Sequence, residues 1–186
     1  MEFLETGLPG AWLIKPRVFR DERGFFLETF TEAQFAEHGI TDRFVQDNHS
    51  RSRVRGVLRG MHFQLPPHTQ SKLIRVTRGA IYDAIVDLRV GSPTYGLWRG
   101  FTLSDENLAM LYVPEGFAHG FCTVADDTDV VYKAGNYYAP SHDSGIVWND
   151  TDVGIDWPVA QPVLSAKDSA LQSLAAFESP FRYDGG

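Results

Sequence analysis

The stretch Lys72-Leu73-Ile74-Arg75-Val76-Thr77-Arg78-Gly79-Ala80-Ile81-Tyr82-Asp83-Ala84-Ile85-Val86-Asp87-Leu88 decides the fold class of this chain. It holds two apolar runs separated by the turn dipeptide Arg78-Gly79. In the second run, one set of residues alternates with another: Ala80, Tyr82, Ala84 and Val86 with Ile81, Asp83, Ile85 and Asp87. Because successive residues of a strand point to opposite faces, the pattern predicts a strand buried on both faces except at its aspartates.

The rest of the chain shows the same alternation of short predicted strands and turns. Apolar runs recur at residues 97–103 and 129–133, and turn signals recur at Gly91-Ser92-Pro93, Pro114-Glu115-Gly116 and Ala139-Pro140. Many short strands at such spacing are typical of an all-β sandwich or barrel. Helix signals are limited to residues 31–39, 104–110 and 165–174, so we expect one β-domain, residues 1–186, with a few short helices.

Composition and charge narrow the class of protein. The chain has 186 residues, of which 43% are hydrophobic and 22% charged, which is ordinary for one globular domain. Its formal net charge of −7 argues against a nucleic-acid partner and against a membrane surface. The N-terminus is acidic, unlike a signal peptide, and Cys122 has no second cysteine to pair with. We therefore expect a cytoplasmic protein.

Two histidines lie in glycine-flanked strand contexts. His119 follows the pattern Pro-x-Gly-x-x-His in Pro114-Glu115-Gly116-Phe117-Ala118-His119, which resembles the second signature of cupins, a double-stranded β-helix or jelly-roll barrel. Where metal cupins carry His-x-His, this chain reads His62-Phe63-Gln64, and His68 stands where a carboxylate is expected. An amide is a weak ligand, so we predict a cupin pocket without a metal and His62 free to act as a base.

Three further side chains complete a candidate proton-transfer pocket. Tyr132 lies on a predicted strand and is a candidate general acid, although a packed aromatic is the simpler interpretation. Lys72 alternates with Ile74 and Val76 and should face inward, where an ammonium group needs an anion. Arg59 would share the face of His62 only if Gly60 allows a bulge. Such a set suits proton transfer beside a carbonyl of an anionic substrate.

Arg59, His62 and His119 lie in a series of sequence blocks that resembles the dTDP-4-dehydrorhamnose 3,5-epimerase family. The resemblance covers residues 19–168, which is most of the chain. The blocks, in order, are Asp21-Glu22-Arg23-Gly24-Phe25-Phe26-Leu27-Glu28, Phe44-Val45-Gln46-Asp47-Asn48, Gly56-Val57-Leu58-Arg59-Gly60-Met61-His62-Phe63-Gln64, Val86-Asp87-Leu88-Arg89, Pro114 to Phe121, Trp148-Asn149-Asp150 and Leu164-Ser165-Ala166-Lys167-Asp168. One block alone is weak, whereas all of them at family spacing are highly specific.

The resemblance implies a role for each site residue. His62 would remove the sugar proton, Asp168 would orient His62, Tyr132 would return a proton from the other face, and Lys72 would stabilise the enolate oxygen. Substrate-binding roles would fall to Arg23, Glu28, Gln46, Asn48, Arg59, His119, Lys167 and Tyr138, the last stacking on thymine. Asp143, where many relatives carry glutamate, would also bind the substrate.

The implied reaction inverts C3 and C5 of dTDP-4-keto-6-deoxyglucose, giving dTDP-4-keto-L-rhamnose. Because oxidation state does not change, no cofactor is expected, and the sequence has no Gly-x-Gly-x-x-Gly dinucleotide motif after a strand. Family members are dimers, which implies a homodimer with N-terminal strands crossing between subunits. Four alternatives stay open: a C3-only epimerase, a nucleotide-sugar ketoisomerase, a non-catalytic sugar-nucleotide-binding cupin and a metal oxygenase.

Overall fold

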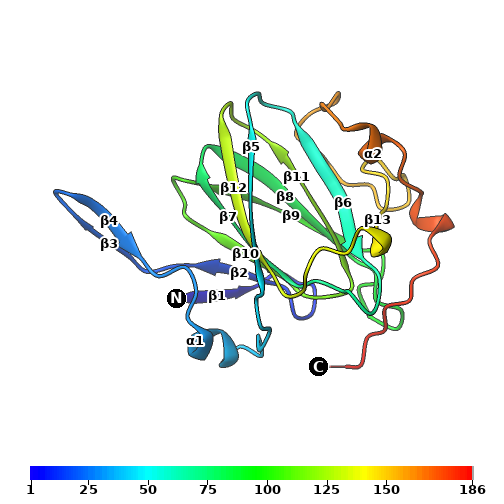
Figure 1. Cartoon of the computed structure of the whole chain (residues 1–186), viewed down its shortest axis with the longest axis horizontal. Coiled ribbons are helices and arrows are strands. Elements are labelled where there is room, and N and C mark those ends of the chain that lie inside the picture. Colours follow the sequence, from blue (N-terminus) through cyan, green and yellow to red (C-terminus); the bar gives the residue numbers. More distant parts are fainter. Residues whose placement is uncertain (186) are drawn as a thin grey trace.

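Two antiparallel β-sheets face each other and enclose the apolar runs (Figure 1). The computed structural model describes residues 1–185. The larger sheet has the order β1 (Glu2–Glu5), β2 (Trp12–Lys15), β10 (Met110–Val113), β7 (Lys72–Arg78), β12 (Thr128–Ala134) and β5 (Gln46–Ser52). The smaller sheet has the order β13 (Asp143–Gly145), β6 (Leu58–Gln64), β11 (Phe117–Thr123), β8 (Ala80–Asp87) and β9 (Trp98–Ser104). The predicted all-β fold is confirmed.

The two runs that decide the fold lie on opposite sheets. In β7, Ile74 and Val76 point between the sheets, and in β8, Ile81 and Ile85 meet them there. The other face of β8 is also covered, because Ala84 and Val86 pack under the C-terminal segment, with Phe177 and Phe181 among their neighbours. Burying each large apolar side chain stabilises the fold by about 1.5–3 kcal/mol. The doubly buried strand predicted from the sequence is thus confirmed.

A two-stranded hairpin projects from the barrel. It consists of β3 (Val18–Asp21) and β4 (Gly24–Leu27), and Figure 1 shows it extending away from both sheets. Phe25 and Phe26 on this hairpin are 56% and 67% exposed. Their exposure leaves apolar surface uncovered by the rest of residues 1–185, and an isolated hairpin is only marginally stable in water.

The helices are shorter than expected. Helix α1 (Glu32–Ala36) ends before Gly39, whose positive φ of 77° reverses the chain. The turn expected at residues 104–110 closes through the Leu108 amide and the Ser104 carbonyl, and it stops there because Leu108 is left-handed.

Near the C-terminus, α2 covers only Ala166–Ser169, and 3-10 turns lie at Pro140–His142 and Leu174–Ala176. The long helix expected at 165–174 is wrong because Gln172 pairs instead with the strand-like Ile146.

Candidate active site

A hollow of about 300 Å³ lies between the inner faces of the two sheets. It gathers seven of the side chains predicted from the sequence, which come from β6, β7, β11, β12 and the α2 region: Arg59, His62, Lys72, His119, Tyr132, Lys167 and Asp168. Residues more than one hundred positions apart in the chain therefore face one another. The antiparallel pairing of the strands, rather than any local motif, brings them together.

His62 and Asp168 form the central pair of this pocket. The Nε2 atom of His62 lies 2.5 Å from Oδ1 of Asp168, and the carboxyl group is almost fully buried. Asp168 is held by α2, whose N-cap Ser165 accepts a hydrogen bond from the Asp168 amide. Burial lowers the pKa of His62, while Asp168 opposes that effect and Lys72 adds to it. At neutral pH the ring is therefore poised to accept a proton, with Nδ1 as its free nitrogen.

Tyr132 stands on the opposite sheet from His62. It lies on β12, beside Asn48 of β5 in the ladder. Burial raises the pKa of Tyr132, Arg59 lowers it and Asp143 raises it, so its hydroxyl keeps a proton at neutral pH. A base on one wall and a protonated acid on the other are the two groups that inversion at a carbon requires.

Lys72 supplies a buried cation. Burial lowers the pKa of its ammonium group to about 8, although Asp83 and Asp143 raise it. Its one hydrogen bond within residues 1–185 runs to the backbone oxygen of His62 at 3.5 Å, which is long. A lysine with free donors in a partly dry pocket is suited to stabilise an oxyanion. The inward orientation predicted from its alternation with Ile74 and Val76 is confirmed.

A bulge places Arg59 in the same pocket. His119 pairs with His62, whereas two residues further along β11, Phe121 pairs with Arg59, which is three residues from His62. The extra residue on β6 resets the alternation, as expected from Gly60. That position accepts only glycine, because a Cβ atom there would lie 2.5 Å from the Cα of Gly120. The bulge that the sequence left open at Gly60, and on which the inward orientation of Arg59 depended, is therefore present.

A chain of polar contacts leads outward from the pocket. Lys167 and the hydroxyl of Tyr138 both donate to Oδ2 of Asp143. Burial raises the pKa of Asp143, but the hydrogen bonds from Lys167 and Tyr138 outweigh it and leave the pKa lowered. The amide of Tyr138 donates to Gln46 Oε1, and Gln46 donates to Asn48. Five of the predicted substrate-binding residues thus form one connected wall, with the exposed Tyr138 ring at its rim.

Two predicted residues lie elsewhere in this chain. Arg23 is in the tip of the projecting hairpin, paired with Asp21, and Glu28 follows β4 on the surface. Neither lines the inner hollow. Because the hairpin points away from its own barrel (Figure 1), these side chains serve this pocket only if a second copy delivers them.

Sequence reasoning missed four residues of the site. Ser50, Phe121 and Ser165 line the hollow, and Asp83 lies behind His119 with its Oδ1 atom 2.6 Å from His119 Nε2. Ser50 shares the inward-facing parity of Gln46 and Asn48, so the alternation of β5 was a usable signal. Asp83 is an aspartate among apolar neighbours in the sequence. Its place in the site could be recognised only once the structure showed that it bonds His119.

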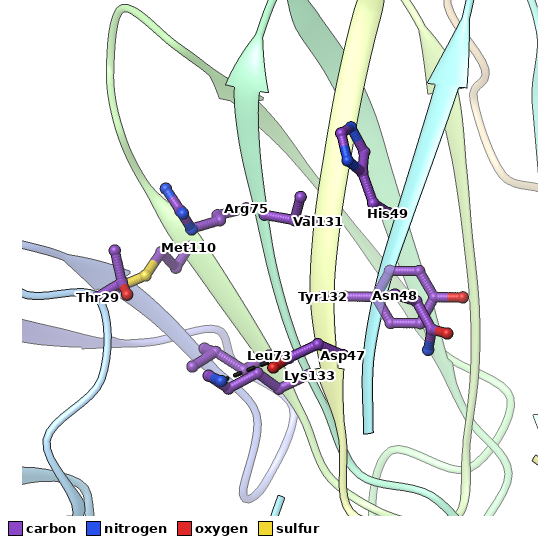
Figure 2. A pocket seen from close by; sticks show the side chains of 10 residues that line it. All are labelled: Thr29, Asp47, Asn48, His49, Leu73, Arg75, Met110, Val131, Tyr132 and Lys133. Carbon is purple, nitrogen blue, oxygen red and sulfur yellow. Dashed lines mark hydrogen bonds and ion pairs between the residues drawn. The ribbon is translucent and has the colours of Figure 1, made fainter. Parts of the chain in front are cut away.

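A second hollow, of about 350 Å³, lies on the other face of the larger sheet. Figure 2 shows its lining, with Lys133 and Asp47 joined on one side of the strands while Tyr132 and Asn48 point to the other. Leu73, Met110 and Val131 form its apolar floor. Its ionic contacts are exposed, so the chemistry gathers in the inner hollow and not here.

Across residues 1–185, no group of three or more His, Cys, Asp and Glu side chains is arranged to hold a metal ion. Nor does any helix in that part of the chain have the length and apolar character needed to cross a bilayer.

The fold and the pocket together define a cupin-type β-barrel whose inner hollow carries the side chains of acid–base chemistry. The sequence profile of the dTDP-4-dehydrorhamnose 3,5-epimerase family matches residues 5–176. The chain belongs to this family of isomerases.

Known relatives span nearly its whole length. A dTDP-4-dehydrorhamnose 3,5-epimerase from Methanothermobacter thermautotrophicus is 55% identical over 92% of this chain and 94% of its own. A 3,5-epimerase structure from Legionella pneumophila in complex with dTDP-4-keto-L-rhamnose superposes with a TM-score of 0.94 at 43% identity, covering 99% of both chains. A dTDP-4-dehydrorhamnose 3-epimerase from Streptomyces niveus is 42% identical over 94% of this chain and 84% of its own.

Proposed function

We propose that the chain epimerises dTDP-4-keto-6-deoxy-D-glucose at C3 and C5, giving dTDP-4-keto-L-rhamnose. One observation carries the proposal: His62, paired with the buried Asp168, and Tyr132 face the same hollow from opposite sheets. This arrangement supplies a base and an acid on two sides of a sugar ring. Both carbons flank the C4 ketone, so one base–acid pair serves both centres.

Each inversion is a balanced proton transfer. Nδ1 of His62 takes the proton from the carbon beside the ketone, and the electron pair of the C–H bond moves to the C4 oxygen as an enolate. Lys72 stabilises that oxygen, and Asp168 stabilises the imidazolium that forms. The Tyr132 hydroxyl then donates a proton to the opposite face of the carbon. Proton exchange with water returns both side chains to their starting states.

Substrate recognition falls to the polar wall and the rim. Arg59 is exposed at the pocket and has the bidentate geometry that phosphate binding favours. Lys167 and Asp143 lie beside it, and the exposed ring of Tyr138 offers a face for the nucleotide base. Gln46 and Asn48 present amide groups for the sugar nucleotide along β5.

The decisive experiment is incubation with dTDP-4-keto-6-deoxyglucose in deuterium oxide, followed by proton NMR of the sugar. Deuterium at both C3 and C5 is the expected result. Deuterium at C3 alone would overturn the double epimerisation in favour of a C3-only enzyme. The absence of exchange in folded protein would reject both and favour a binding-only cupin. A chelator control should leave turnover unchanged, and stoichiometric metal in elemental analysis would instead favour a metal enzyme.

We further propose that the protein is a homodimer in which the β3–β4 hairpin of each subunit reaches the pocket of the other. The exposed Phe25 and Phe26 supply apolar surface for such a contact, and Arg23 lies at the tip. Light scattering should give twice the chain mass.

Subunit mixing tests which pocket Arg23 serves. Arg23→Ala and His62→Ala should each be inactive alone. Mixed by co-expression, they should recover roughly a quarter of wild-type activity, because half of the dimers carry one intact pocket. If Arg23 serves its own subunit, the mixture stays inactive.

A further inference from the structure

Asp83 is a carboxyl group in the interior of the barrel. It lies on β8 between Ile81 and Ile85, and its exposed fraction is 0%. Its Oδ1 atom bonds His119 Nε2 at 2.6 Å, whereas its Oδ2 atom is buried without a hydrogen-bond partner among residues 1–185. A buried carboxylate oxygen left without a donor destabilises the fold. Its retention here points to a charge that the carboxyl group serves.

A second buried aspartate on the same strand has hydrogen bonds to both of its carboxylate oxygens. Asp87 is also 0% exposed, but both of its oxygens accept hydrogen bonds from Arg89, and Ser92 and Thr94 add further donors. These bonds lie at the end of the barrel that bears the turn after β8 and not at the inner hollow. Asp87 therefore fastens a turn, and Asp83 differs from it in having a free oxygen beside the candidate active site.

Lys72 is a cation that lines the same hollow as His119, the partner of Asp83. It extends inward from β7 of the larger sheet, while Asp83 lies between the inward-facing Ile81 and Ile85 on β8 of the smaller sheet. Its weak 3.5 Å contact leaves donors free, and Asp83 is the foremost group that raises its pKa against the effect of burial. Without a counter-charge, an ammonium group in this position would lose its proton near neutral pH.

We propose that Asp83 is a positioning residue of the epimerase: its buried carboxylate fixes the His119 ring and keeps Lys72 an ammonium ion where the enolate oxygen forms. The pocket then has two histidine–carboxylate pairs with different duties. His62–Asp168 handles the proton, and His119–Asp83 maintains the cationic side. The role in turnover rests on the proposed epimerisation, whereas the effect on the charge of Lys72 does not.

Other charged and titratable groups also surround Lys72 in the inner hollow. They come from β6, β11, β12, β13 and α2: Arg59, His62, His119, Tyr132, Asp143, Lys167 and Asp168. Asp143 also raises the pKa of Lys72, and Lys167 lowers it. Because Lys167 donates directly to Asp143, these two charges largely compensate each other. Of the two carboxyl groups that raise the pKa of Lys72, Asp83 is the one without a lysine or arginine partner of its own within residues 1–185.

The test is a lysine titration, which needs no turnover. The chain has four lysines, Lys15, Lys72, Lys133 and Lys167, so carbon-13 labelling at Cε gives a spectrum of four signals. Lys72→Arg identifies the signal of interest by its loss. In wild-type protein that signal should titrate with a midpoint near 8. In Asp83→Asn the midpoint should fall by one pH unit or more, roughly a tenfold change in the proton affinity.

Enzyme kinetics provides the second readout. In Asp83→Asn, the alkaline decline of kcat/KM should shift to a correspondingly lower pH, because Lys72 loses its proton at a lower pH. Asp87→Asn is the matched control, because it makes the same chemical change at an equally buried position of the same strand. This variant should have a lower melting temperature and an unchanged Lys72 midpoint. An unchanged Lys72 midpoint in folded Asp83→Asn would overturn the proposal even if the enzyme is an epimerase.

A folding failure of Asp83→Asn still decides the question. The double variant Asp83→Asn/Lys72→Met removes both charges together. Recovery of folding in the double variant supports the charge pair, since breaking one partner of a buried pair is worse than removing both. A double variant that also fails to fold would contradict it. If the titration behaves as expected but no sugar exchanges deuterium, the epimerisation fails and the charge assignment stands.

Discussion

Two histidine–aspartate pairs, one on the outer face of the larger sheet and one in the inner hollow, have different environments. His49 of β5 bonds Asp129 of β12 at 3.0 Å on the outer face, with 61% of the histidine side chain exposed. His62 bonds Asp168 at 2.5 Å in the inner hollow, with 29% exposed. Solvent weakens the outer pair, whereas burial shifts the pKa of the inner histidine. A histidine–aspartate pair is therefore not by itself a sign of catalysis. Burial in the inner hollow makes His62–Asp168 the candidate.

The largest effect should come from deleting the two histidines in turn. His62→Ala should lower kcat by roughly 10²–10⁴-fold, the usual contribution of a general base, while nucleotide binding is largely kept. His49→Ala should leave kcat within twofold, since the outer pair touches no substrate. Steady-state kinetics and calorimetric titration of dTDP measure both. Near-normal turnover in His62→Ala would show that another group is the base.

The next largest effect concerns the acid. Tyr132→Phe should reduce completed epimerisation by roughly 10²-fold or more, because the opposite face of the carbon loses its proton donor. Deuterium exchange without inversion should persist, since His62 still removes and returns a proton on its own face. Tyr137→Phe, an exposed tyrosine near the pocket rim, serves as the control. Simultaneous loss of exchange and inversion would contradict separate roles for the two groups.

The partner of His62 should affect the pH profile as well as the rate. Asp168 raises the pKa of His62, so Asp168→Asn should lower that pKa and move the acidic limb of kcat/KM to lower pH. The plateau rate should also drop by about 10²-fold as the ring loses its orientation. Asp129→Asn on the outer face should change neither quantity. A limb that moves to higher pH would mean that Asp168 does not act through His62.

The smallest effect is expected at Ser50. Its Oγ atom lines the inner hollow, and the described chain offers it no hydrogen-bond partner. A hydrogen bond to the bound sugar nucleotide would contribute about 0.5–1.5 kcal/mol, so Ser50→Ala should raise KM by a few fold with kcat nearly unchanged. Ser52→Ala, two residues along the same face and outside the hollow, should have no effect. Equal KM values for the two variants would remove Ser50 from the binding site.

Much of this site could be predicted from sequence because strands alternate. The parity of Lys72 with Ile74 and Val76 placed its ammonium group inside the barrel, and Gly60 suggested the bulge that brings in Arg59. The helix expected at residues 165–174 was overextended because its capping signal at Ser165 is local, whereas Gln172 is drawn away by a distant partner. The orienting role of Asp168 came from family resemblance, since no spacing links it to His62.

Sequence by itself determined the strand pattern and the two-sided burial of β8, and it named candidates for the base, the acid and the inward-facing lysine. These follow from the period of the β-strand and from the chemistry of side chains. Only the tertiary structure showed that Asp83 pairs with His119, that Asp83 keeps a free oxygen while Asp87 does not, and that the β3–β4 hairpin, whose turn carries Arg23, projects away from its own barrel. Such pairings depend on contacts between residues far apart in the chain. The spacing of residues along the sequence does not encode which of them lie close together in space.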